Sequence, residues 1–94
     1  MLLTLSSTAQ SVSIEMKNDH LKSGDKIAFQ VKCDSEIDLE ITIFSGDCLV
    51  IQQKSRLSAD VHSFEFDENP CKPGKYFILI SGPKTHVEKE FVIE

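Results

Sequence analysis

The sequence predicts an all-β fold, and three observations lead to this prediction. Apolar and polar residues alternate with a period of two along most of the chain, as they do in half-buried strands. Clusters of Gly, Pro, Asn, Asp and Ser interrupt the alternation roughly every ten residues, which is typical of turns between short strands. No segment repeats its apolar residues with the period of about 3.6 residues that an amphipathic helix requires.

The clearest strand lies between a turn at Pro73-Gly74 and a turn at Gly82-Pro83. Between them, Tyr76-Phe77-Ile78-Leu79-Ile80 is a run of five large apolar or aromatic residues. Because such a run has no polar face, it predicts a strand buried on both sides at the centre of a sheet. Tyr76 is expected to be structural, with its hydroxyl bonded to an upstream backbone group, as in many sandwich folds.

Two amphipathic strands precede this central strand. Their inward-facing residues are expected to be Ile27, Phe29, Val31 and Cys33 in the first and Ile37, Leu39, Ile41 and Ile43 in the second. Four further strands are expected at 12–16, 48–52, 63–67 and 87–93, whereas 18–25 and 54–60 are expected to be loops. Seven short strands with this spacing predict an antiparallel immunoglobulin-like β-sandwich. An eight-stranded barrel is the less favoured fold, because it would need one more strand than the seven that the sequence predicts.

Composition and charge argue against several classes of partner. The chain has 94 residues, which fits one domain, and its formal net charge is −5. Its ten basic residues are scattered, whereas binding to nucleic acid or to an anionic membrane needs clustered Lys and Arg. No transmembrane segment is expected, because no apolar run approaches the roughly 20 residues that span a bilayer.

The first nine residues differ from the rest. Leu2-Leu3-Thr4-Leu5 is apolar, and Ser7-Thr8-Ala9 places small residues before Gln10. This pattern resembles the end of a secretory signal peptide cleaved after Ala9, although no basic segment precedes it. An ordinary first strand is the alternative. We therefore expect residues 1–9 to be a signal-peptide remnant and residues 10–94 to form one domain that is exported to the periplasm, the cell surface or the medium.

The three cysteines predict one disulfide if the protein is exported. Because successive strands alternate in direction, Cys48 and Cys71 are expected at the same end of the sandwich. Cys33 is expected at the opposite end, in phase with the buried face. A Cys48–Cys71 bridge is therefore the predicted pair, and three reduced thiols in a cytosolic protein are the alternative. The cysteine spacings do not fit a zinc site.

No catalytic, cofactor or metal site is predicted. Glu36, Asp38 and Glu40 form an acidic row, but residues two apart on a strand are about 6.6 Å apart, so a solvated face is expected rather than a calcium site. The 67–69 loop is a second weak candidate for a cation. The three histidines lie in different elements, and no pairing typical of nucleophilic catalysis is visible.

The central strand has more apolar side chains than one core face can bury. Only one face of a two-layer sandwich is core, so the second apolar set must be covered or exposed. The residues assigned to a partner face are Phe44, Val50, Phe77, Ile78 and Leu79. The sequence leaves open which face of the central strand is exposed. Such a face predicts a protein partner or self-association.

Three segments of the second half resemble a known bacterial family. They are Ala59–Asp67, the Pro73-Gly74-Lys75-Tyr76 turn and the terminal Glu90–Ile93 strand. Together they resemble the C-terminal secretion-sorting domain family, and the resemblance covers about residues 24–94. The same sandwich occurs in small, free-standing exported bacterial proteins of unknown function with an immunoglobulin-like fold. This chain resembles the free-standing group more, since it ends in Glu94 rather than a basic residue and shows no cargo domain.

The resemblance implies the fold and export, and it implies no catalytic residues. We therefore expect a non-enzymatic, exported module that binds protein or has an accessory role in a bacterial envelope. A carbohydrate-binding module is the alternative, although the chain has one Tyr, no Trp and six Phe residues that lie mostly in core phase. A secretion-sorting domain and a small hydrolase are less favoured.

Overall fold

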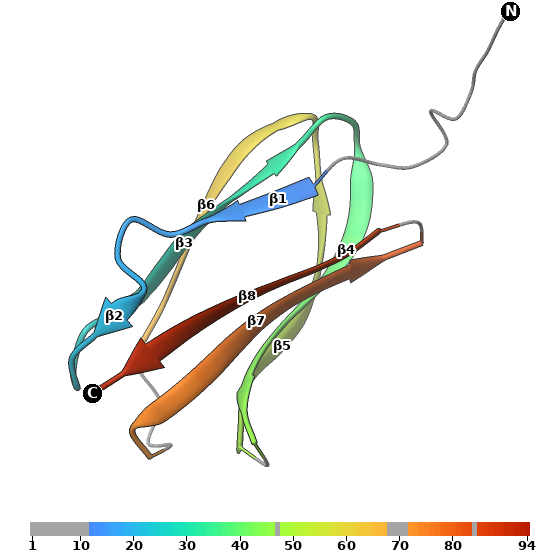
Figure 1. The fold of residues 1–94 in the computed structure, drawn as a ribbon. Coiled ribbons are helices and arrows are strands. Elements are labelled where there is room, and N and C mark those ends of the chain that lie inside the picture. The colour runs from blue at the N-terminus through green and yellow to red at the C-terminus, as the bar shows by residue number, and fades with distance from the viewer. Residues whose placement is uncertain (1–11, 47, 68–71, 84) are drawn as a thin grey trace, which may run out of the picture.

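The computed structural model describes residues 12–46, 48–67, 72–83 and 85–94. This part of the chain forms eight strands and is sandwich-like (Figure 1), which confirms the predicted all-β class. The strands are β1 (Val12–Glu15), β2 (His20–Leu21), β3 (Ile27–Cys33), β4 (Ile37–Ser45), β5 (Cys48–Leu57), β6 (Asp60–Phe66), β7 (Gly74–Gly82) and β8 (Thr85–Ile93). The described residues contain no helix that is long and apolar enough to cross a membrane.

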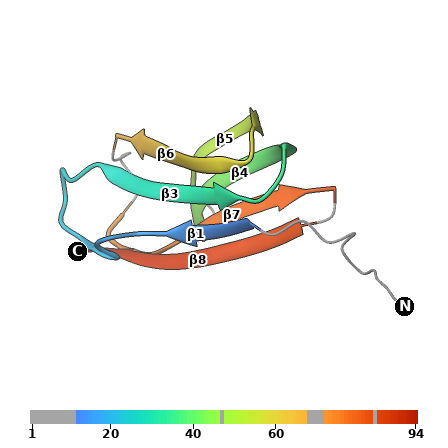
Figure 2. The same cartoon turned by 90° about the horizontal axis from the view of Figure 1, so that it is seen from above.

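The strands are divided between two sheets. One sheet has three strands in the order β1-β3-β6, and the other has five in the order β2-β8-β7-β4-β5. All pairs of neighbouring strands are antiparallel except β2 and β8, which are parallel. Figures 1 and 2 both show β1 next to β8, so these two strands bring one edge of the two sheets together.

The core lies between the two sheets and contains no charged or polar side chain among the described residues. Alternation along each strand supplies one inward-facing set, as the sequence predicts for β3 and β4. The buried residues are Leu21, Ile27, Phe29, Val31, Cys33, Ile37, Leu39, Ile41, Ile43, Leu57, Tyr76, Ile78, Ile80, Phe91 and Ile93. Burial of these apolar side chains is the main force that holds the sheets together.

The run from Tyr76 to Ile80 is central, as predicted, because β7 lies between β8 and β4 in the larger sheet. The expectation that it is buried on both sides is wrong. Ile78 and Ile80 are fully buried, whereas Phe77 and Leu79 are only half-buried. The reason is that the three-stranded sheet covers only one face of the larger sheet.

The strand count and the boundaries of two strands also differ from the prediction. There are eight strands in the described chain rather than seven, because β2 forms within the expected 18–25 loop. Most of the expected 54–60 loop is also strand, since β5 runs to Leu57 and β6 begins at Asp60. The inward positions of β5 include the half-buried polar residues Gln53 and Ser55, so this edge strand lacks a clear apolar alternation.

The parallel β2–β8 pair joins two segments that are distant in sequence. His20 is opposite Val92, and Leu21 is opposite Ile93. The backbone N–H of Val92 donates to the oxygen of Asp19 at 2.9 Å, and the N–H of Glu94 donates to that of Leu21 at 2.8 Å. The chain thus crosses from the small sheet to the large one between β1 and β2.

Candidate functional site

The outer face of the five-stranded sheet carries an apolar cluster, which we call the outer patch. It consists of Phe44 on β4, Leu49 on β5, and Phe77 and Leu79 on β7. Phe44 is opposite both Leu49 and Phe77, so three of these residues form one row across neighbouring strands. The rings of Phe44 and Phe77 stack with centroids 5.5 Å apart. Leu49 is the most exposed member, at 53%.

A β-bulge in β5 places Leu49 in this row. Ile43 is opposite Ile51, but the next residue, Phe44, is opposite Leu49, so Val50 is the extra residue. Val50 is half-buried and packs against the core cluster. The assignment of Val50 to the partner face is therefore wrong. Sequence reasoning missed Leu49 because the bulge changes the alternation at a point that the residue pattern does not mark.

The assignment of Ile78 to the partner face is also wrong. Ile78 is 0% exposed and points into the core, because it alternates with Phe77 and Leu79 on the same strand. Phe44, Phe77 and Leu79 do share the outer face, as the sequence suggests. Whether this face binds a partner stays a prediction.

Charged residues border the outer patch on two sides. On β8, Glu88 is opposite Leu79 and Glu90 is opposite Phe77. The Lys75 Nζ atom lies 4.0 Å from a carboxylate oxygen of Glu90, so Glu90 is partly neutralised. On the opposite side, β5 contributes Lys54. The patch therefore has Glu88 and Glu90 beside it on β8, and Lys54, opposite Glu40, beside it on β5.

The acidic row at residues 36–40 is compensated by β5 and does not converge on a common point. An Nη atom of Arg56 lies 3.1 Å from Glu36, and its Nε atom lies 3.7 Å from Asp38. The hydrogen bond and charge of Glu36, together with the charge of Asp38, raise the pKa of Arg56. Gln52 donates to Glu40 at 3.4 Å. The described residues hold no group of three or more His, Cys, Asp or Glu side chains suited to a metal, and residues 68 and 69 lie outside them.

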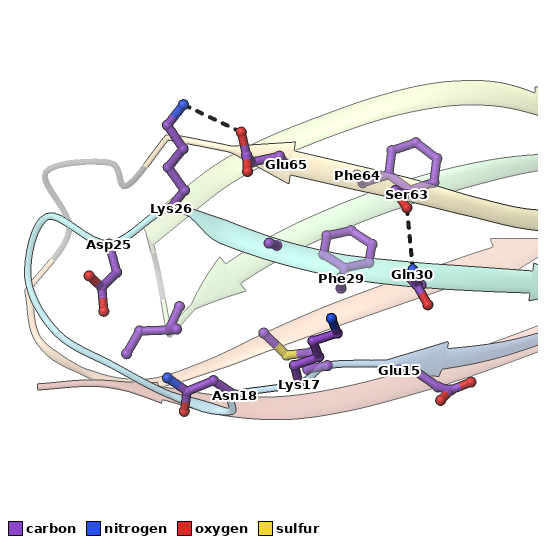
Figure 3. Close-up of a pocket in the computed structure, with 13 residues that line it drawn as sticks. Glu15, Lys17, Asn18, Asp25, Lys26, Phe29, Gln30, Ser63, Phe64 and Glu65 are labelled. Atoms are coloured by element: carbon purple, nitrogen blue, oxygen red, sulfur yellow. Dashed lines mark hydrogen bonds and ion pairs between the residues drawn. The ribbon is translucent and has the colours of Figure 1, made fainter.

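A second surface feature is a groove of about 850 Å³ on the three-stranded sheet. It forms where β1 ends at Glu15 and the chain crosses to the other sheet, and Phe29 and Gln30 of β3 are among the residues that line it (Figure 3). Lys26 and Glu65 form an ion pair at 3.3 Å along its border. Gln30 donates to Ser63 at 3.4 Å. These polar groups therefore satisfy one another within the groove.

Tyr76 anchors the start of β7, one residue before Phe77. Its hydroxyl donates to the backbone oxygen of Lys72 at 2.7 Å, and its ring stacks on Phe91 with centroids 5.5 Å apart. Tyr76 is 1% exposed. The predicted structural role of this tyrosine is confirmed.

The described cysteines differ in oxidation state. Cys48 is disulfide-bonded, whereas Cys33 is free and is 4% exposed within the core. Burial and the charge of Asp34 raise the pKa of the Cys33 thiol. Cys71 lies outside the described residues, so its pairing with Cys48 stays a prediction.

The three histidines are distributed over β2, β6 and β8. His20 Nδ1 lies 3.5 Å from a carboxylate oxygen of Glu94, and His62 Nε2 lies 2.8 Å from the backbone oxygen of Ser58. His86 is opposite Ser81 at the far end of β7. The fold therefore distributes the imidazoles over separate strands, as their sequence positions suggest.

No protein-family model matches this chain, and no curated protein matches it. The function of this protein is therefore inferred from its surfaces.

Proposed function

We propose that this protein is an exported, non-enzymatic β-sandwich that acts as a protein-binding or accessory module of a bacterial envelope. The outer patch carries the proposal. It places a stacked phenylalanine pair and two leucines on a sheet face that no other described element covers. Apolar side chains gathered on an open face are typical of protein-interaction surfaces.

The strand order supports an immunoglobulin-like type of sandwich. The order β1-β3-β6 corresponds to strands A-B-E of that fold, and β8-β7-β4-β5 corresponds to G-F-C-C′. Tyr76 supports the same assignment, because it stands near the start of the strand equivalent to F and bonds back to Lys72. The segments that resemble the free-standing exported domains correspond to β6, the start of β7 and the end of β8.

Two observations support export. The Ser7-Thr8-Ala9 pattern resembles a signal-peptide cleavage site. The disulfide at Cys48 is typical of proteins that fold in an oxidising compartment.

Protein binding is favoured over carbohydrate binding by the geometry of the aromatic pair. A sugar ring usually stacks on exposed, flat aromatic faces. Here Phe44 and Phe77 are both half-buried, and their planes are inclined by 30° as they stack on each other. Each ring is thus partly covered by its neighbour, and neither presents a full face to a sugar.

Polar substitution in the outer patch tests this proposal. Leu49→Ser and Leu79→Ser are expected to weaken capture of a partner from an envelope extract by about tenfold or more, because apolar anchors at an interface centre contribute most of the affinity. Val61→Ser is the matched control, since Val61 is 47% exposed on the other sheet. Thermal melting should first show that all three variants are folded. A monomer whose capture is the same in all variants would contradict the proposal.

A further inference from the structure

The outer face of the five-stranded sheet has a charge pattern that is complementary to itself. Glu88 and Glu90 lie on β8, and Lys54 lies on β5, opposite Glu40 of β4. Between β8 and β5, the outer face carries Phe77 and Leu79 on β7, and Phe44, Thr42 and Glu40 on β4. Lys54 and Glu88 are both exposed. Neither forms an ion pair within the described part of the chain. Each is therefore available to an opposite charge on another molecule.

We infer that the outer patch binds a second copy of this chain, face to face, about a two-fold axis parallel to the strands; this inference rests on the proposed protein-binding function. Such an axis lays β8 of one copy over β5 of the other, and β7 over β4. In the dimer, Phe77 of each copy then packs on Phe44 of the other copy. A two-fold interface repeats every contact in this way.

The same arrangement brings Glu88 of one copy near Lys54 of the other. Glu88 is in the row that runs through Leu79 and Thr42 to Gln52. Lys54 is two residues further along β5, about 6.6 Å away, and a lysine side chain spans such a distance. The charges are thus placed for two symmetric ion pairs.

The size of the face predicts a weak dimer. Four strands of about nine residues give a face of roughly 30 by 19 Å, on the order of 600 Å² on each copy. Stable complexes bury about 800 Å² on each partner, and smaller faces form transient contacts. We therefore expect dissociation in the micromolar range or above, measurable by sedimentation equilibrium up to about 1 mM protein.

A charge-swap pair tests this arrangement. Glu88→Lys alone and Lys54→Glu alone should each raise the dimer dissociation constant about tenfold or more, because each homodimer then faces like charges twice. An equimolar mixture of the two variants should recover wild-type association, since both contacts in the mixed dimer join opposite charges. Glu15→Lys and Lys32→Glu make the same charge changes on the other sheet, and they should leave the dissociation constant unchanged.

The outcomes separate this inference from the proposed function. A wild-type protein that stays monomeric at about 1 mM overturns the inference, and so does a dimer that the swaps do not change or that the mixture does not restore. If the protein is monomeric but Leu49→Ser and Leu79→Ser still lose a captured partner, the protein-binding function stands and only the second copy is excluded. If the protein is monomeric and Leu49→Ser and Leu79→Ser capture the partner as well as the wild type does, both the inferred dimer and the proposed protein-binding function fail.

Discussion

Tyr76 shows how one polar atom can fix a strand that is otherwise held by apolar packing. Its hydroxyl donates to the backbone oxygen of Lys72 at 2.7 Å, in a residue that is 1% exposed. Tyr76→Phe keeps the stack on Phe91 but leaves that carbonyl without its donor. We expect the free energy of unfolding to fall by about 1–2 kcal/mol. A urea titration should show a lower midpoint with an unchanged slope.

The control removes a hydroxyl from an exposed position. Ser63 accepts a hydrogen bond from Gln30 at 3.4 Å on the outer face of the small sheet. Ser63→Ala should change the free energy of unfolding by no more than about 0.5 kcal/mol. Equal midpoints for Tyr76→Phe and the wild type would show that the hydrogen bond does not stabilise the start of β7.

At the scale of the element, the bulge in β5 decides which of two adjacent apolar residues faces water. Leu49 is 53% exposed, whereas Val50 packs against the core. Val50→Asp should therefore lower the free energy of unfolding by about 2 kcal/mol or more, because it places a charge against apolar side chains. Leu49→Asp should cost less than about 1 kcal/mol. Chemical denaturation of both variants checks the order, and the reverse order would indicate a regular β4–β5 ladder without the bulge.

The elements that could be predicted are those whose pattern follows from burial alone. Ile37 to Ile43 alternate because β4 lies within its sheet, between β5 and β7, and has one face on the core. The second half of β5 could not be predicted in this way, because it is an edge strand whose inward positions Gln53 and Ser55 are polar. The bulge at Val50 has no residue signature either, so the outer patch was predicted with Val50 in the place of Leu49.

Over the whole molecule, the closure of the sandwich depends on pairings between distant residues. β2 has only two residues and pairs with the last strand across more than 70 positions of sequence. A strand this short has no period to detect, and its position follows from the route of the chain between the sheets. Leu21 nevertheless belongs to the core at 5% exposure, so the crossing segment also contributes to burial. The same closure brings β1 beside β8, and no other described strand covers the outer face of the larger sheet (Figure 2).

The compartment of the protein can be tested on the intact molecule. After expression in a bacterial host with residues 1–9 present, we expect the mature mass to lack those residues. Thiol labelling of the denatured, unreduced protein should then modify one cysteine, Cys33, because Cys48 is disulfide-bonded. Labelling of the folded protein should be slow, since Cys33 is buried and its raised pKa reduces the thiolate fraction at a given pH.

Replacement of Cys48, one predicted partner in the disulfide, gives a variant that can be compared with the wild-type protein. Cys48→Ser should expose a second thiol to labelling, on Cys71, and should lower the free energy of unfolding by roughly 3 kcal/mol, because the unfolded chain regains the freedom of the open loop. A domain of this size has a small stability margin, so that loss should be visible as a lower melting temperature. A full-length chain with three labelled thiols would contradict both export and the bridge. It would also place the outer patch among cytosolic partners, where a search for its binding protein would then have to begin.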